Sequence, residues 1–187
     1  MEAGGLTPKA NAAIMYVMDV SGSMGDEQKE IVRTESFWLD AWIRSHYQGV
    51  RTVYIVHDAA AKEVDREVFF TLRESGGAVI SSAYELAVRI VEERFPVADW
   101  NLYLFHFTDG ENYSRQDSDK SADLLAEKLL PAVNLFGYGQ VEALGTRGDF
   151  IDVLRARFAS DERVALSRIP DRDAIVVSIK EFLGRGR

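Results

Sequence analysis

The chain has 187 residues, of which 47% are hydrophobic, with no cysteine and a formal net charge of −8 at pH 7. This length and hydrophobic content are enough for one domain with a full core. The negative charge, without any Lys/Arg cluster, argues against nucleic acid or an anionic membrane surface as a partner, and the lack of cysteine excludes disulfides and thiolate metal sites.

A single domain is expected over residues 12–184, between an N-terminal tail at residues 1–11 and a short C-terminal tail at 185–187. The first residues contain Gly, Pro and Thr without hydrophobic periodicity, which is typical of a loose tail. They contain no apolar segment of the kind that directs export, and no apolar run in the chain approaches the ~20 residues of a membrane span. We therefore expect a cytoplasmic protein that does not insert into a membrane.

The first half of the domain alternates apolar runs, typical of strands, with segments of helical hydrophobic spacing. Strands are expected at residues 13–18 and 50–56, with a short extra edge strand at 62–72. A helix is expected from Asp26 to about residue 47, with Trp38 and Trp42 in the core. The next helix should begin at the serine pair Ser81-Ser82, as its N-cap, and stop before residue 96, a proline.

The second half continues this alternation of strand and helix. Strands are expected at residues 102–107, 132–138 and 164–169, and helices at 118–130, 150–158 and from Asp171 to a stop at Gly184. Such an alternation predicts a Rossmann-like, doubly wound, mostly parallel six-stranded sheet with helices on both faces. The expected strand order is 3-2-1-4-5-6, with the third strand as an antiparallel edge.

Oxygen-bearing side chains follow two of the predicted buried strands. Asp19, Ser21 and Ser23 come after the first strand, and Asp109 follows the fourth. In the expected order these strand ends lie side by side where the winding of the sheet reverses, which is where such sheets bind ligands. Carboxylate and hydroxyl oxygens suit Mg²⁺ or Mn²⁺. The alternative is that Asp19 and the serines only cap the following helix.

The same residues carry a resemblance to a known family. The segment Asp19–Met24, with sequence DVSGSM, resembles the metal-ion-dependent adhesion site (MIDAS) of von Willebrand factor type A (VWA) domains, and Phe107–Glu111 resembles their second acidic turn. Residues 69–77, 81–83 and 100–103 resemble the bacterial YeaH/YhbH family of uncharacterised, sporulation- and stress-associated proteins.

The resemblance covers residues 13–183 and carries several functional implications. It implies a VWA-like fold, binding of Mg²⁺ or Mn²⁺, and work as a protein-interaction module. It also suggests association with a serine kinase and a SpoVR-type protein.

One position departs from the family pattern. The family carries a threonine ligand directly after the Gly-Gly pair, and here that residue is Ala78, whose methyl group cannot coordinate a cation. Water could fill the gap at lower affinity, Ser81 or Ser82 could move in, or the site no longer holds a metal. His57, after the second strand, is a candidate to support a metal ligand, and Glu111 could rim the site.

Two further histidines have structural interpretations only. His46, near the end of the first helix, should be solvated. His106, within a buried strand, should be a core residue with satisfied hydrogen bonds.

The usual enzyme patterns are missing. A phosphatase with Asp19 as nucleophile would want a second carboxylate two residues later, where Ser21 stands, and neither a G-x-S-x-G nor a G-x-x-x-x-G-K-[ST] motif is present. We therefore expect a binding module rather than an enzyme, in which a partner's Asp or Glu completes the coordination of the cation. The alternatives are a VWA-like scaffold that binds partners without metal and, less favoured, a phosphatase or hydrolase using Asp19 or Ser23.

Overall fold

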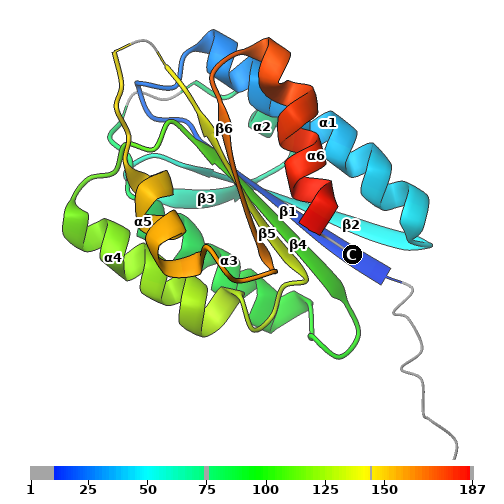
Figure 1. Ribbon diagram of the computed structural model, residues 1–187. Helices are drawn as coiled ribbons and strands as arrows, with labels where there is room; N and C mark the ends of the chain where they lie inside the picture. The colour runs from blue at the N-terminus through cyan, green and yellow to red at the C-terminus, as the bar shows by residue number, and fades with distance from the viewer. Residues whose placement is uncertain (1–10, 74–75, 144, 186–187) are drawn as a thin grey trace, which may run out of the picture.

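A six-stranded sheet forms the centre of the computed structural model, which describes residues 11–73, 76–143 and 145–185 (Figure 1). The strands are β1 (Asn11–Asp19), β2 (Gly49–His57), β3 (Ala61–Val64), β4 (Asn101–Thr108), β5 (Leu135–Val141) and β6 (Val164–Ile169). Their order is β3-β2-β1-β4-β5-β6, and β3 runs antiparallel to β2 while all other neighbouring pairs are parallel. The expected fold class and strand order are confirmed.

Helices cover both faces of this sheet (Figure 1). They are α1 (Asp26–His46), α2 (Arg66–Thr71), α3 (Ile80–Arg94), α4 (Arg115–Leu124), α5 (Phe150–Phe158) and α6 (Ile175–Arg185), with a π-turn at Leu125–Leu129 and a 3₁₀ turn at Arg172–Ala174. One core cluster lies under α1, α2 and α6, and another under α3, α4 and α5. No helix in the described ranges is long and apolar enough to cross a membrane.

β1 shows why the central strands read as continuous apolar runs. Ile14 and Tyr16 belong to the cluster under α1 and α6, whereas Met15 and Val17 belong to the cluster on the other face. Successive side chains of a strand point to opposite faces, and both faces of this parallel sheet are covered. Alternation of polar and apolar residues is therefore lost in the middle of the sheet.

The expected edge strand at residues 62–72 is wrong over most of its length. β3 ends at Val64, and Asp65 accepts a hydrogen bond from the Val68 amide at 2.8 Å, which makes it the N-cap of the short helix α2. Phe69 of this helix is fully buried under the sheet. The irregular alternation of this segment belongs to a strand followed by a six-residue helix.

Several other boundaries differ from expectation. The strand predicted at residues 132–138 is β5, three residues further on, because the amides of Ala132 and Val133 both turn back to the Leu129 carbonyl. α6 does not stop at Gly184 but includes Arg185. Residues 1–10 and 186–187, which make up most of the expected tails, lie outside the described residues.

Trp38 is not a core residue. Its side chain is 54% exposed and forms a T-shaped pair with the exposed Phe37, with ring centroids 5.3 Å apart. Trp42 is half-buried and lines a groove between α1 and α6 together with Ile179. Helical spacing marked the apolar surface of α1 correctly, but the sheet and α6 cover only part of it.

Candidate metal centre

The two acidic turns meet at one edge of the sheet. β1 ends at Asp19 and its parallel neighbour β4 ends at Thr108. Asp19 is fully buried; its Oδ1 accepts the Ser21 amide at 2.8 Å and its Oδ2 accepts the Thr108 hydroxyl at 2.7 Å. The bond from Thr108 joins the second turn directly to the first.

The serine hydroxyls of the first turn lie beside each other. Ser21 Oγ and Ser23 Oγ are 3.3 Å apart. The N-cap of α1 is Gly25, without a side-chain cap, so the alternative that Asp19 and the serines cap this helix is wrong. Asp19 instead accepts the Ser21 amide and the Thr108 hydroxyl, and the two serine hydroxyls contact each other.

Asp109 has an unusual environment for a carboxylate. It is 1% exposed, and its Oδ1 accepts the Glu111 amide at 3.0 Å. Its Oδ2 is buried and has no hydrogen-bond partner among the described residues. Burial raises the pKa of Asp109, and the nearby charge of Asp19 raises it further. The Ser23 hydroxyl lowers this pKa in part, although the two side chains form no hydrogen bond of normal geometry. A buried, unpartnered carboxylate oxygen is costly unless a cation compensates it.

A third segment completes the site. The Gly22 amide donates to the Gly76 carbonyl at 3.2 Å, and the Tyr113 amide donates to the Ala78 carbonyl at 2.8 Å. The three segments line an open cavity of about 310 Å³, with the exposed Glu111 at its rim. Ala78 lines this cavity together with Ser21 and Ser23.

Neither serine of the pair near Ala78 replaces that ligand. Ser81 Oγ donates to Asp117 Oδ1 at 2.5 Å, and Ser82 Oγ donates to the Val79 carbonyl at 2.7 Å. The expectation that this serine pair is the N-cap of α3 is wrong, because the N-cap is Val79.

The first amides of α3 are instead satisfied from the second acidic turn and α4. Asn112 Oδ1 accepts the Ile80 amide at 3.1 Å, and Asp117 Oδ2 accepts the Ser81 amide at 3.1 Å. Sequence analysis missed Asn112 and Asp117 because their partners are more than 30 residues away and leave no local spacing signal.

His57 lies behind the first acidic turn. It pairs with Asp19 in the register of β1 and β2, and its carbonyl accepts the Val20 amide at 2.9 Å. Its Nε2 is 2.9 Å from Nε2 of His106, whose Nδ1 is 2.8 Å from the Tyr84 hydroxyl. Burial lowers the pKa of both imidazoles, so both are neutral at pH 7.

The placement of the three histidines settles their expected roles in part. His106 is the satisfied core residue that we expected, and His46 is exposed as expected. His57 supports the backbone of the turn rather than the carboxylate of Asp19 through its ring.

The donor set fits a hard divalent cation. It offers two carboxylates and two hydroxyls, from Asp19, Ser21, Ser23 and Asp109, and oxygen ligands with room for water suit Mg²⁺ or Mn²⁺. The described part of the chain has no group of three or more His, Cys, Asp or Glu side chains that could by themselves hold a metal ion. Hydroxyls, water and a partner would therefore have to complete the coordination of such a cation.

Sequence comparison finds one family and a set of curated relatives. The sequence profile of a family described as "Protein of unknown function (DUF444)" matches residues 5–186. A "UPF0229 protein" of Ruminiclostridium cellulolyticum is 44% identical over 131 residues, which are 70% of this chain and 32% of the relative. A "UPF0229 protein" of Thiobacillus denitrificans is 38% identical over 162 residues, which are 87% of this chain and 38% of the relative. The chain thus spans about a third of the length of the curated relatives it matches.

Structure comparison finds VWA-type folds. A von Willebrand factor type A protein from Catenulispora acidiphila has a TM-score of 0.66 at 15% identity, over 95% of this chain and 42% of that chain. The structure titled manganese-loaded Plasmodium vivax TRAP protein has a TM-score of 0.59 at 14% identity, over 94% of this chain and 74% of that chain. The expected VWA-like fold is confirmed.

Proposed function

Because this chain belongs to the family described as a protein of unknown function (DUF444) and folds as a VWA-type domain, we propose that it is a protein-interaction module that binds a partner carboxylate through Mg²⁺ or Mn²⁺. Asp19, Ser21, Ser23 and Asp109 would hold the cation. The observation that carries this proposal is Asp109 Oδ2, a buried carboxylate oxygen with no hydrogen-bond partner in the described ranges, beside a second buried carboxylate.

The bound cation would supply an electrophilic centre with open coordination positions, and the protein determines what reaches it. The cavity between the three segments is open to solvent at Glu111 and Tyr113, both of which are exposed. A carboxylate on a partner's surface can enter such an opening, whereas a whole folded partner can contact only the rim. The segments that line the cavity would therefore determine which partners bind.

Support for a binding role rather than catalysis comes from the groups around the site. His57 and His106 are buried, neutral and hydrogen-bonded to one another. Neither imidazole is therefore placed to exchange a proton with a ligand in the cavity. The proposal extends to a bacterial stress or sporulation kinase system, an extension that rests on family resemblance alone.

Ala78→Thr tests where the cation lies. We expect it to tighten Mn²⁺ binding by about tenfold, because it adds a hydroxyl oxygen to the cavity that Ser21 and Ser23 also line. The matched control is Ala78→Val, which has nearly the shape of threonine but no oxygen, and which should bind Mn²⁺ no better than the unaltered chain.

Both affinities can be measured from the electron paramagnetic resonance signal of free Mn²⁺ during titration. A gain with threonine and none with valine supports ligation next to residue 78. Equal affinities for the two variants would show that the cation does not bind there.

A further inference from the structure

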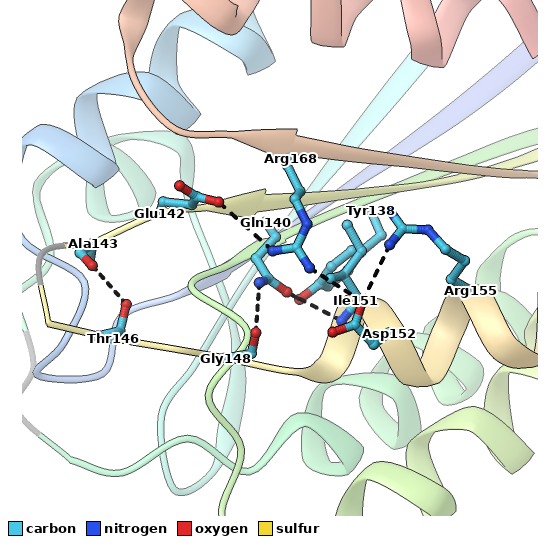
Figure 2. A network of polar contacts seen from close by, with 10 residues as sticks. All are labelled: Tyr138, Gln140, Glu142, Ala143, Thr146, Gly148, Ile151, Asp152, Arg155 and Arg168. Carbon is cyan, nitrogen blue, oxygen red and sulfur yellow. Dashed lines mark hydrogen bonds and ion pairs between the residues drawn. The ribbon is translucent and has the colours of Figure 1, made fainter.

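The Gln140 side chain, near the end of β5, is held by three hydrogen bonds (Figure 2). It is 2% exposed; Oε1 accepts the Tyr138 hydroxyl at 3.1 Å and the Ile151 amide at 3.2 Å, and Nε2 donates to the Gly148 carbonyl at 2.9 Å. The Ile151 amide can only donate and the Gly148 carbonyl can only accept, so the orientation of the amide group is fixed. Gln140 thereby joins β5, the first turn of α5 and the segment before α5.

The second acidic turn packs directly against this arrangement. A Cβ added to Gly148 would lie 2.1 Å from the carbonyl carbon of Gly110 and 2.3 Å from the Asp109 carbonyl oxygen. Gly110 has a φ of +83°, and a Cβ there would lie 2.2 Å from Gln140 Oε1. The Phe150 amide also donates to the Gly110 carbonyl, at 3.3 Å. The backbone of Asp109–Gly110 is thus in contact with both Gln140 and Gly148.

The opposite side of this turn is held by the first acidic turn. The Thr108 hydroxyl donates to Asp19 Oδ2 and accepts the Gly110 amide at 3.1 Å. The backbone that carries Asp109 therefore lies between two supports, one at Asp19 and one at Gln140. Among the described residues the Glu111 amide, itself part of this turn, makes the one hydrogen bond of normal geometry to the Asp109 carboxylate, so the position of the carboxylate follows the backbone.

We infer that Gln140 is a positioning residue for Asp109. By holding Gly148 against Asp109–Gly110, it fixes the direction of the unpartnered Oδ2 and so sets the affinity for the cation. The inference rests on the proposed cation site. Residues that orient a metal ligand without touching the metal typically change affinity by roughly 10–100-fold when altered.

The segment between β5 and α5 does not depend on Gln140 alone. Gln28 of α1 donates to the Glu142 carbonyl at 3.1 Å. Arg168 of β6 lies 3.8 Å from the Glu142 carboxylate and 3.3 Å from the Asp152 carboxylate (Figure 2). These contacts would keep the segment near the sheet when the Gln140 amide is removed. Replacement of Gln140 should therefore loosen the acidic turn without unfolding the protein.

Gln140→Met is the test, because methionine has a similar length and neither the donor nor the acceptor. We expect Mn²⁺ affinity, measured from the free-ion resonance signal, to fall at least roughly tenfold. The control is Thr146→Ala, which removes a bond to the Ala143 carbonyl within the same segment and should leave the affinity unchanged. The free energy of urea unfolding without metal is measured for each variant in parallel.

The outcomes separate positioning from a merely structural role. A structural role alone predicts lower stability with an unchanged Mn²⁺ affinity of the folded protein, and that result would overturn the inference. If Gln140→Met does not fold, Gly148→Ala serves instead, since its methyl group must displace the Asp109–Gly110 backbone and should weaken binding in the same way. Failure of the unaltered chain to bind Mn²⁺ would overturn the proposed function, and this inference with it.

Discussion

Asp109→Asn should raise the stability of the metal-free protein and, at the same time, weaken Mn²⁺ binding by roughly a hundredfold, because it removes one of two charged ligands. Asp109 is buried beside Asp19, and its Oδ2 has no partner among the described residues. Neutralising it removes the cost of burying this charge, which should add on the order of 1 kcal/mol to the free energy of unfolding. A gain in stability with a loss of binding marks a residue kept for function.

The pH dependence of this gain has a definite sign. Burial raises the pKa of Asp109 in the folded protein above its value in the unfolded chain. The native state then binds more protons than the unfolded state between those two pKa values, so the charged carboxylate lowers stability as pH rises through that window. The stabilisation by Asn should be complete above the folded pKa and absent in acid below the unfolded pKa.

Urea unfolding in EDTA and Mn²⁺ titration measure the two effects separately. The control is Asp117→Asn, since Asp117 accepts hydrogen bonds from the amide and the hydroxyl of Ser81 at the start of α3 and is not one of the proposed cation ligands. This control should lose stability and keep its Mn²⁺ affinity. An Asp109→Asn variant that is less stable and binds Mn²⁺ normally would show that Asp109 serves the fold.

Glu35→Gln should stabilise the protein by a few kcal/mol at pH 9, since each pKa unit corresponds to about 1.4 kcal/mol. Glu35 lies on α1, is 0% exposed, and neither carboxylate oxygen has a hydrogen-bond partner among the described residues. Burial raises the pKa of Glu35 to about 8. The nearby Ser178 hydroxyl of α6 opposes this rise only in part, and the two side chains form no hydrogen bond of normal geometry. Glu35 is therefore protonated in the folded protein at pH 7.

The sign follows from the two pKa values. Between 4.5 and about 8 the folded protein keeps the Glu35 proton while the unfolded chain has lost it, so stability falls as pH rises through this window. Glutamine cannot ionise, so its advantage should be large at pH 9 and disappear near pH 4.

Urea unfolding at pH 4, 7 and 9 checks this pH dependence. Glu30→Gln is the control, because Glu30 lies on the same helix but is exposed and paired with Arg33. Its effect should stay within roughly 0.5 kcal/mol. Equal pH dependence of the two variants would contradict the assignment of Glu35 as the buried titrating group.

The arrangement of the sheet could be predicted from the sequence because continuous apolar runs separated by helical patterns leave few topologies. The approach of Asp19 and Asp109 followed from the same order, since the ends of parallel neighbours meet at one edge of the sheet. Boundaries were less accurate. The sequence did not indicate that Asp65 caps a helix. The strand predicted at 132–138 starts directly after Pro131, whereas the turn continues through residue 132 and β5 begins only at Leu135.

The parts that could not be predicted depend on contacts between distant residues. Asp117 reaches Ser81 across 36 positions, and nothing near Gln140 in the sequence indicates that it supports Gly148 and the turn at Asp109. The burial of Glu35 has no signal in the sequence, because glutamate is rarely buried without a partner. Periodicity also cannot tell which part of a wide apolar surface is covered, so it does not distinguish the exposed Trp38 from a core residue.

The most direct measurement of the central claim is the relaxation of water protons by protein-bound Mn²⁺, with the protein in excess, as sodium acetate is added. Acetate stands for the partner's carboxylate, and acetamide, which has a similar shape and no charge, is the control. If the cation has an open position that accepts a carboxylate, acetate should displace bound water and lower the relaxation rate, while acetamide should not. A relaxation rate that does not change with acetate would contradict carboxylate binding at this site.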